Sequence, residues 1–479
     1  MAFSDVIRLH ARHRSSKVAL VHGEKQWTYA QLDAAVDAVC WRLTQHGVHY
    51  GELVGVSLQD TAEHLLMLLA LSRIGAVILP VDRRWHVLER LSVCEHFDAR
   101  WILVEPDDPL EHADVVRVDA SWYGSSAKPY RDERVVDSTP LLLSLSSGTT
   151  GMPKGPRATH LQFESRFLPY WVDLGFTSRD RYVSATPLYF GGGRGFSLAM
   201  LYAGATVFMF PPPYEPRQLI EYAARVQATQ LFLVPTLLRR ILAADFEGLA
   251  FPTVTKLVSS GSMLHMEERL QIKRRLTDNL FELYASTEGG SVSMLSPQDF
   301  HDYPDSVGRP VFRVDVAIVD NNHEPLPPGQ IGRLRYRSPA SAHSYYKGDS
   351  AEAFHEDWFY PGDLALMNDQ GYIYLKGRSK DMIIRGGVNI YPGDVESVLI
   401  EAPQVSDAAV VGVPSAELGE EIVAFVVTKS AVTQEDLIKL CRGRLASYKV
   451  PRTIYFVESF PKNAMGKTLK AELIRQLPL

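Results

Sequence analysis

Along the first 260 residues, segments with apolar positions at helical spacing alternate with short apolar runs. Residues 27–43 and 61–74 carry apolar side chains at helical spacing, with Thr28 before the first run and Gly75 after the second. Short apolar runs typical of buried strands separate the helical runs. The further segments of this alternation, helix-like and strand-like together, are 53–58, 77–81, 88–96, 101–104, 182–185, 196–201, 205–210, 216–226, 230–234, 236–244 and 256–260. This alternation predicts parallel βαβ units, and therefore an α/β fold of doubly wound sheets.

The pattern changes near residue 305. From there to about residue 375, short alternating runs at 315–319, 331–336 and 371–375 are separated by Pro and Gly, which predicts a β-barrel-like subdomain. Beyond residue 377 the predicted elements form a compact α+β unit of about 100 residues. They are 394–402, 407–413, 422–428, 433–445 and 452–457. We expect a large N-terminal domain at 1–378 and a small C-terminal domain at 379–479.

Composition narrows the class of protein. The chain has 479 residues, 46% hydrophobic and 22% charged, which is typical of a globular protein of several folding units. Its net charge of −6 provides no basic surface for nucleic acid. No apolar stretch is long enough to span a membrane, and no export signal is expected at the first residues. Cys40, Cys94 and Cys441 are widely spaced, which disfavours disulfides and zinc sites and suits a cytoplasmic protein.

The strongest local motif lies at residues 141–155. A buried strand runs into a loop of hydroxyl residues, glycines and one lysine, Lys154. Glycines let backbone N–H groups approach an anion, and hydroxyls and lysine add donors and charge, as phosphate binding requires. The spacing is not that of a Walker A loop. A mobile surface turn is the alternative.

Four further motifs follow in order. They are Tyr-Ala-Ser-Thr-Glu at 284–288, Tyr-Pro-Gly-Asp at 360–363, Gly-Arg-Ser-Lys-Asp at 377–381 with Gly-Gly-Val-Asn-Ile-Tyr-Pro at 386–392, and Asn-Ala-Met-Gly-Lys at 463–467. Together with the loop, they resemble the adenylate-forming superfamily of acyl- and aryl-CoA synthetases, luciferases and peptide-synthetase adenylation domains. The resemblance covers essentially the whole chain, from about residue 3 to 470.

The resemblance implies an ATP-dependent enzyme with a phosphate loop in its N-terminal domain. In that loop, the β- and γ-phosphates would be bound by Ser146, Ser147, Gly148, Thr149, Thr150, Gly151 and Lys154. Glu288 would bind Mg²⁺, Thr287 would contact the α-phosphate, and Tyr284 would stack on adenine near the backbone of Gly261. Each of these residues also has an ordinary alternative, such as a surface carboxylate or a core aromatic.

The resemblance assigns roles to the C-terminal motifs as well. Asp363 would accept the ribose hydroxyls with support from Arg378, although a turn residue and a structural salt bridge are the alternatives. Lys467 would bridge the attacking carboxylate and the α-phosphate. Lys380 would be the hinge about which a mobile C-terminal domain rotates. Gly386 and Gly387 would then line a tunnel for pantetheine, or would simply form a turn.

The acid to be activated is only partly constrained. Amino-acid-activating relatives carry an Asp after Pro-Leu-x-Phe, whereas here Phe190 is followed by glycines, so an α-amino acid is disfavoured. We expect these glycines to form a loop, which either makes space for a bulky or flat acyl group or is simply a flexible entry to a helix. We expect an apolar acyl pocket that suits an aryl or medium-sized acyl group. Its lining residues would be Tyr189, Phe190, Gly193, Phe232, Val234 and Met263. Arg194 would pair with a second carboxylate or polar substituent, or would face solvent.

The predicted activity is an AMP-forming acid–thiol ligase, a carboxylic acid–CoA ligase. It would form an acyl-AMP from ATP, release pyrophosphate and transfer the acyl group to coenzyme A. One alternative keeps adenylation but passes the acyl group to the phosphopantetheine of an acyl carrier protein, or to an amine. Another is a non-catalytic sensor that binds nucleotide or acyl ligand. Intact Lys467, Glu288, Asp363 and Arg378 favour the enzyme.

Overall fold

The computed structural model describes residues 3–123, 128–145, 153–262, 264–347, 350–386, 388–415, 417–462 and 468–477. The chain divides into two compact units. Unit 1 comprises residues 1–304, 308–315 and 336–359, and unit 2 comprises 305–307, 316–335 and 360–479. The domain boundary predicted at residue 378 stays a prediction.

One sheet of unit 1 is formed by the first strands of the predicted βαβ pattern. Its order is β6-β5-β3-β4-β7-β8, in which β8 alone runs antiparallel to its neighbour. The bounds are β3 Leu53–Val56, β4 Val77–Pro80, β5 Trp101–Val104, β6 Val115–Arg117, β7 Pro140–Leu143 and β8 Arg157–Thr159. The parallel core of this sheet confirms the α/β prediction.

The second sheet of unit 1 has nine strands, in the order β15-β14-β13-β12-β11-β9-β10-β1-β2. Its central strands from β13 to β1 are parallel, and β2, β14 and β15 add antiparallel edges. The bounds are β1 Val18–His22, β2 Lys25–Thr28, β9 Arg181–Ser184, β10 Thr206–Met209, β11 Gln230–Phe232, β12 Lys256–Ser260, β13 Leu280–Ser286, β14 Gly290–Leu295 and β15 Arg309–Pro310.

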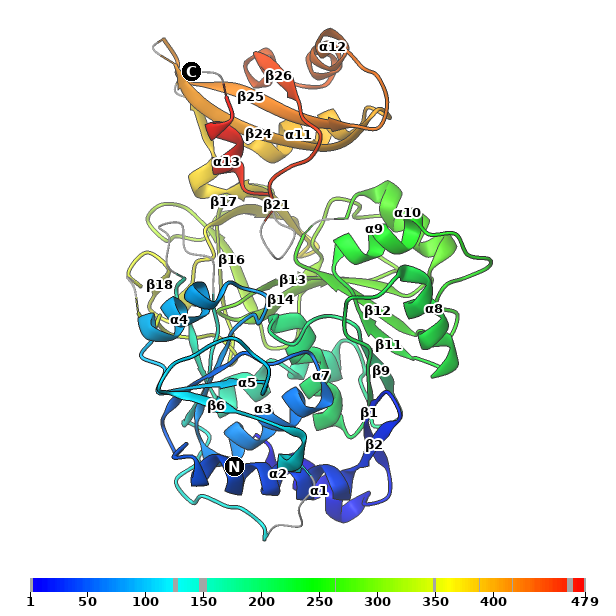
Figure 1. Ribbon diagram of the computed structural model, residues 1–479. Helices are drawn as coiled ribbons and strands as arrows, with labels where there is room; N and C mark the ends of the chain where they lie inside the picture. Colours follow the sequence, from blue (N-terminus) through cyan, green and yellow to red (C-terminus); the bar gives the residue numbers. More distant parts are fainter. Residues whose placement is uncertain are drawn as a thin grey trace. The chain divides into compact units, whose positions relative to one another are not determined.

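Helices cover both sheets of unit 1. They are α1 Asp5–His13, α2 Tyr29–Gln45, α3 Ala62–Ile74, α4 Val87–His96, η1 Ala120–Tyr123, α5 His160–Ser165, α6 Leu168–Val172, α7 Gly191–Ala203, α8 Pro216–Arg225, α9 Pro235–Ala243 and α10 Met266–Arg275. Figure 1 shows α8, α9 and α10 in green beside β11 and β12. Helix α3 is buried along nearly its whole length and contacts both β4 and β1, so it packs between the two sheets.

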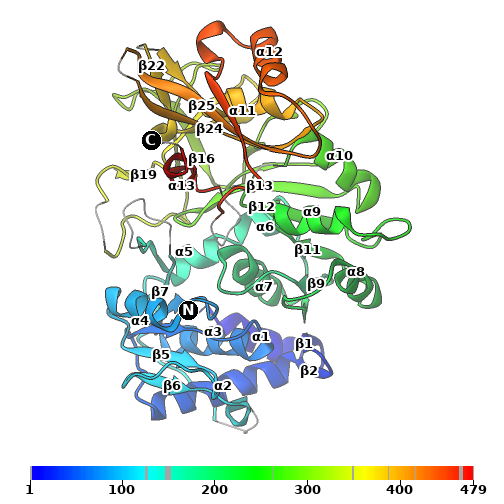
Figure 2. The same ribbon diagram turned by 45° about the horizontal axis from the view of Figure 1, so that its top comes forward.

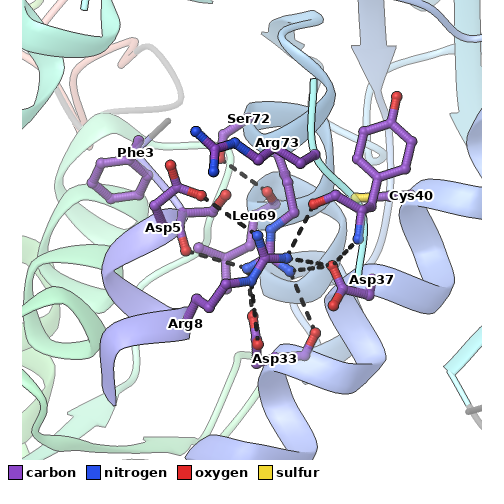
Figure 3. Close-up of polar contacts among 12 residues, drawn as sticks. Phe3, Asp5, Arg8, Asp33, Asp37, Cys40, Leu69, Ser72 and Arg73 are labelled. Atoms are coloured by element: carbon purple, nitrogen blue, oxygen red, sulfur yellow. Dashed lines mark hydrogen bonds and ion pairs between the residues drawn. The ribbon is translucent and has the colours of Figure 1, made fainter. Parts of the chain in front are cut away.

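A buried charge network joins the first three helices (Figure 3). The Arg73 guanidinium on α3 contacts Asp33 and Asp37 of α2, each at 2.6 Å. Arg8 of α1 reaches the same Asp37 carboxylate at 2.7 Å, and the Tyr130 N–H donates to it at 3.0 Å. The network therefore compensates a cation that is only 2% exposed.

Short antiparallel strands occupy the region of the predicted barrel. They are β16 Asp315–Val319, β17 Gly332–Arg337, β18 Phe354–His355, β19 Trp358–Phe359, β20 Asp363–Met367 and β21 Ile373–Arg378. In unit 1, Tyr336 of β17 pairs with Phe359 of β19. In unit 2, Gly332 of the same strand pairs with Ala365 of β20, which also pairs with β21. The prediction of short, mostly antiparallel strands here is confirmed.

The C-terminal part of unit 2 is the expected α+β arrangement. Its strands form the order β23-β22-β25-β24, with β26 parallel to β25. The bounds are η2 Ser379–Asp381, β22 Ile383–Arg385, β23 Val388–Ile390, α11 Pro392–Ile400, β24 Val405–Ser415, β25 Gly419–Thr428, α12 Gln434–Arg444, η3 Ser447–Lys449, β26 Thr453–Phe456 and α13 Lys470–Arg475. Helix α11 lies beside β24, and α12 contacts α11 and β26 (Figure 2). Across the described ranges, every helix is too short or too polar to cross a membrane.

Candidate active site

The Tyr-Ala-Ser-Thr-Glu motif lies at the hairpin between β13 and β14 in unit 1. Ser286 is the last residue of β13, and its hydroxyl accepts the Gly289 N–H at 3.0 Å and contacts the Tyr336 hydroxyl. A Cβ at Gly289 would lie 2.5 Å from the Tyr336 ring, so the turn closes only because that position has no side chain. The hairpin thus holds Thr287 and Glu288 in a defined turn.

Arg166 supports this turn from α5's C-terminal end. Its Nη2 donates to the carbonyl oxygens of Thr287 at 3.1 Å and Glu288 at 3.3 Å. Burial lowers the pKa of Arg166, and the nearby Glu288, Tyr336 and Tyr170 act in the opposite direction. Arg166 therefore fixes the backbone of the two residues that the resemblance places at the phosphates.

Glu288 is 8% exposed, and its carboxylate lies beside the end of the predicted phosphate loop. The Tyr345 hydroxyl donates to Glu288 Oε1 at 3.1 Å, and Lys154 Nζ lies 4.8 Å from the centre of the Tyr345 ring. The Tyr346 N–H donates to the Gly155 carbonyl at 2.7 Å, so the backbone of this segment is also tied to the loop. The structure brings Lys154 and Glu288 together through Tyr345. Residues 146–151, predicted to bind phosphate, lie outside the described residues.

The predicted adenine contacts are on neighbouring parallel strands. Ser260 of β12 is in register with Leu283 of β13, and its hydroxyl donates to the Leu283 carbonyl at 2.7 Å. The next residue on each strand is Gly261, exposed with φ +107°, and Tyr284, partly buried. The structure therefore places Gly261 and Tyr284 side by side, where parallel strands end and ligands commonly bind.

The run of glycines after Phe190, expected as a loop, forms the first turns of α7. A Cβ at Gly192 would lie 2.4 Å from the Phe232 ring, and one at Gly193 would lie 2.3 Å from the Pro187 carbonyl oxygen. Packing against these neighbours outweighs the low helix propensity of glycine. The expectation of a loop was wrong, because tertiary contacts decide the conformation of this segment.

Three other residues of the predicted acyl pocket, Tyr189, Phe190 and Phe232, lie at this helix start. The rings of Tyr189 and Phe190 lie 4.0 Å apart, and Phe232 is buried in a stack on Phe196 with ring centroids 4.6 Å apart. Val234 is partly buried at the N-cap of α9. Met263 lies outside the described residues. The pocket assignment itself stays a prediction.

In unit 2, Asp363 and Arg378 face one another across the β20–β21 pair. Arg378 Nε lies 2.8 Å from Asp363 Oδ1, and Arg378 Nη1 donates to the Pro361 carbonyl at 2.6 Å. Gly362 has φ +80°, which makes the tight turn that precedes Asp363 possible. The ion pair orients a carboxylate that is 9% exposed, and its role toward ribose stays a prediction.

The remaining C-terminal candidates are placed separately. Lys380 lies exposed in η2, immediately after β21. Gly386, with φ +57°, follows β22 at the turn toward β23, and its N–H donates to the Leu418 carbonyl at 2.8 Å. A turn explains the conformation of Gly386, and the tunnel role stays a prediction. Gly387 and Lys467 lie outside the described residues.

Sequence patterns had not singled out Tyr345 or Arg166. Tyr345 is 57 residues from Glu288, and Arg166 is 121 and 122 residues from the carbonyls that it binds. Neither residue belongs to a short motif whose spacing has a known chemical meaning. Only the fold identifies them.

Comparison with known proteins agrees with this arrangement along the whole chain. The family model described as AMP-binding enzyme matches residues 7–346, and that of the AMP-binding enzyme C-terminal domain matches residues 394–467. Indoleacetate–CoA ligase of Aromatoleum aromaticum is 29% identical over 504 aligned residues, which cover 100% of this chain and 98% of that protein. 2-Succinylbenzoate–CoA ligase of Bacillus velezensis is 30% identical and covers 95% of this chain and 94% of that protein.

Solved structures show the same fold. The o-succinylbenzoate CoA synthetase of Bacillus subtilis, in complex with its acyl-adenylate intermediate, has a TM-score of 0.88 at 25% identity. The match covers 98% of this chain and 97% of that chain. The fold is therefore mixed α/β with a large N-terminal and a small C-terminal domain, as predicted. Since the AMP-binding model alone spans more than half of the sequence, the chain belongs to the family of AMP-binding enzymes.

Proposed function

We propose that the protein is an ATP-dependent carboxylic acid–CoA ligase. One observation carries the proposal: the chain aligns over its full length with enzymes named as CoA ligases, including 98% of indoleacetate–CoA ligase. The geometry of unit 1 supports it, because Lys154, Tyr345 and Glu288 form one polar cluster at the end of the predicted phosphate loop.

In the first step, a carboxylate oxygen of the acid attacks the α-phosphorus of ATP. A new O–P bond forms, the bond to the β-phosphate breaks, and pyrophosphate leaves with the electron pair. Negative charge must be neutralised and the reactants aligned for this displacement. We assign Lys154 and the loop 146–151 to the β- and γ-phosphates and Thr287 to the α-phosphate, while Tyr284 and Gly261 would hold adenine.

Glu288 is suited to bind a Mg²⁺ ion that is also bound to the nucleotide. Within the described residues no group of three or more His, Cys, Asp or Glu side chains is arranged to hold a metal. A single buried carboxylate fits a hard cation that takes its other ligands from phosphate oxygens and water. The ion would supply charge neutralisation at the phosphates.

We assign Asp363 and Arg378 to the ribose and Lys467 to the bridge between the attacking carboxylate and the α-phosphate. In the second step, the CoA thiolate attacks the acyl carbon, a C–S bond forms, the C–O bond to the α-phosphate breaks, and AMP leaves with the electron pair. Lys380 as a hinge, with Gly386 and Gly387 along the pantetheine path, belongs to this part of the proposal. These roles follow from the family resemblance and await a direct test.

An aryl or medium-sized acyl group is the proposed substrate. The segment 189–196 and the buried Phe232 present rings and glycines rather than an anchoring carboxylate. The relatives' names point the same way, since indoleacetate and 2-succinylbenzoate both carry an aromatic ring. Transfer to a carrier protein or an amine, and a role as a sensor, have no described residue in their favour. A cytosolic location remains a prediction from the three separate cysteines, which are all free and buried.

The test is acid-dependent ATP–pyrophosphate exchange across aryl, aliphatic and dicarboxylic acids, repeated with CoA under thioester detection. We expect exchange with an aryl or medium-sized acid and a thioester product when CoA is added. Exchange without a CoA thioester would move the assignment to another acceptor. Nucleotide binding without exchange for any acid would contradict the proposal.

The variant Lys467→Ala tests the role assigned to this lysine. It should lose exchange by several orders of magnitude while binding ATP as the wild type does, because it removes a charge needed only in the adenylation step. Lys462→Ala is a suitable control, since that lysine pairs with Asp407 at 3.2 Å on the surface of unit 2. Full exchange activity in Lys467→Ala would remove its assigned role.

A further inference from the structure

Arg194 differs from the other buried arginines of the described chain. Four arginines there are at most 3% exposed, and three have carboxylate partners. The three pairs are Arg73 with Asp33, Arg90 with Asp108 and Arg269 with Glu282. Within the described residues, Arg194 forms no ion pair: its Nη1 donates to the carbonyl oxygens of Leu188 at 3.0 Å and Tyr189 at 2.9 Å, and its Nε has no hydrogen bond. A buried charge without a counter-charge is costly and calls for an explanation.

The surroundings add no compensation. Burial and, to a smaller extent, the positive charge of Arg166 lower the pKa of Arg194 to about 9. The charge of Arg194 acts on His64, but burial lowers the pKa of His64 to about 4, so His64 is neutral at pH 7. The Asp60 carboxylate accepts the Leu188 N–H at 2.6 Å. The guanidinium therefore remains a cation at neutral pH, and the part of the chain that the structure describes supplies it with no counter-charge.

The position of Arg194 on α7 strengthens the positive field. It lies in the first turns of a 13-residue helix whose N-cap, Phe190, provides no side-chain cap, and no acidic residue occupies the first turn. The N-terminus of a helix carries a partial positive charge that favours anions. A cation placed there is an unfavourable arrangement unless an anion binds beside it.

Open space lies along the same helix. Gly191 and Gly195 are four positions apart, hence on one face of α7, and a Cβ at either would meet no atom within 4 Å. Gly195 is nevertheless buried. The two glycines between them, Gly192 and Gly193, pack tightly against Phe232 and Pro187. Of these four glycines, it is therefore Gly191 and Gly195, close to Arg194 in sequence, that border open space.

We propose that Arg194 binds a second carboxylate carried by the acid that the enzyme activates, which makes dicarboxylic acids its preferred substrate class. The inference rests on the proposed function, since it places the acyl group beside α7. The first carboxylate is adenylated, and the second stays ionised and pairs with the Arg194 guanidinium. Arg194 is then a specificity-determining residue, and the bound substrate balances its charge.

The test uses pairs of acids that differ only in the second carboxylate. 3-(2-Carboxyphenyl)propionate is compared with 3-phenylpropionate, and adipate with hexanoate, by pyrophosphate exchange in wild type and Arg194→Leu. In wild type, kcat/KM should favour the dicarboxylic member of at least one pair. Arg194→Leu should lower kcat/KM for that member by about 100-fold, the order expected when one partner of a buried charge pair is removed. The monocarboxylic member should change by less than about 3-fold.

Two further variants separate substrate binding from local structure. Arg194→Lys keeps the charge and should restore part of the dicarboxylate preference, while thermal denaturation checks that each variant is folded. Arg84→Leu is the matched control. Arg84 contacts Tyr189 too, but through the tyrosine hydroxyl, and it is paired with Asp82 at 2.8 Å. It should affect both members of a pair alike.

The outcomes are distinct. Equal losses for both acids in Arg194→Leu, or a wild-type preference for the monocarboxylic member of both pairs, would overturn the inference and leave the ligase proposal standing. A raised KM for ATP with unchanged discrimination between acids would assign Arg194 to a nucleotide phosphate instead and would also overturn it. Absence of exchange with every acid would overturn the proposed function, and this inference with it.

Discussion

The hydroxyl of Tyr345 donates a hydrogen bond of 3.1 Å to the carboxylate of Glu288. The same ring receives Lys154 Nζ on its face, 4.8 Å from its centre, and it packs edge-on against Phe354 at 5.3 Å. One side chain thus contacts both the carboxylate proposed to bind Mg²⁺ and the lysine proposed to bind phosphate. Tyr345 is therefore a positioning residue for both.

Tyr345→Phe should lower kcat/KM for Mg·ATP by about 10-fold, since a hydrogen bond to a charged group contributes roughly 1.5–3 kcal/mol. The ring remains, so its contact with Lys154 is retained. Exchange kinetics at varied Mg²⁺ should show a raised requirement for the ion, which a purely structural role would not produce.

Tyr346→Phe is the control for this experiment. Tyr346 follows Tyr345 directly, but its side chain is 40% exposed and its ring lies under Arg157. It should leave the Mg²⁺ requirement as in wild type. If both variants behave alike, Tyr345 has no specific effect on Glu288.

The charge network of Figure 3 should dominate the stability of the first three helices. Arg73→Met removes the cation that Asp33 and Asp37 contact at 2.6 Å and leaves two carboxylates without it. We expect a loss of about 3–5 kcal/mol in the free energy of unfolding, as for other broken buried pairs. Urea denaturation measures it.

Arg217→Met tests whether burial of the ion pair is the reason for the loss of stability expected in Arg73→Met. Arg217 pairs with Glu221 at 2.9 Å, but both side chains are more than half exposed. Exposed pairs contribute little to stability, so this variant should unfold almost as wild type does. A comparable loss in both variants would contradict the argument from burial.

Two glycines of α7 should respond in opposite ways to the same substitution. Gly195→Ala adds a methyl group where no atom lies within 4 Å, so it should stabilise the helix by about 0.5–1 kcal/mol. Gly193→Ala would place Cβ 2.3 Å from the Pro187 carbonyl and should destabilise by roughly 2 kcal/mol. Melting temperatures of the two variants measure the contrast, and a gain in both would show that α7 packs differently.

Stability should depend on pH between 5 and 6 through groups that include the buried His64 and His160 and the partly buried Asp60. Burial lowers the pKa of His64 and of His160 to about 4, and it raises that of Asp60 to about 6. Between pH 5 and 6, both histidines bind a proton in the unfolded chain but not in the folded chain. Their contribution therefore makes the free energy of unfolding rise with pH. Asp60 holds its proton in the folded chain and acts in the opposite sense.

Single variants separate these contributions. His64→Gln should reduce the slope of unfolding free energy against pH by up to about 1.4 kcal/mol per pH unit, and Asp60→Asn should increase it by a similar amount. Urea denaturation at pH 5.0, 5.5 and 6.0 provides the slopes. A slope that neither variant changes would mean that these groups titrate alike in the folded and unfolded chain.

Local features of the fold were predictable because their causes are local. The Thr28 hydroxyl accepts the Gln31 N–H in a capping box, Thr61 caps α3 in the same way, and Gly75 ends α3 in the left-handed conformation. These interactions join residues at most four positions apart, so spacing and residue type are enough to identify them. The same holds for the apolar runs that became the parallel strands β3, β4 and β5.

The candidate site was predictable only where its residues form short motifs. Tyr284, Glu288, Asp363 and Arg378 were identified by their order and spacing in the chain. The partners that orient them were missed when they came from distant segments, as Tyr345 and Arg166 do. Whether Arg194 faced solvent or was buried was equally open, and it is 3% exposed.

The sequence by itself therefore determined the alternation of helices and strands at residues 27–104 and 182–260, the family and the residues that carry the family's motifs. Tertiary structure alone decided that glycines 191–195 begin a helix, that Tyr345 meets Glu288 and that Arg194 has no carboxylate partner among the described residues. The physical reason is the separation in sequence of the residues that interact. Caps, turns and periodicity arise from neighbours along the chain, whereas burial and charge balance depend on which distant segments pack together.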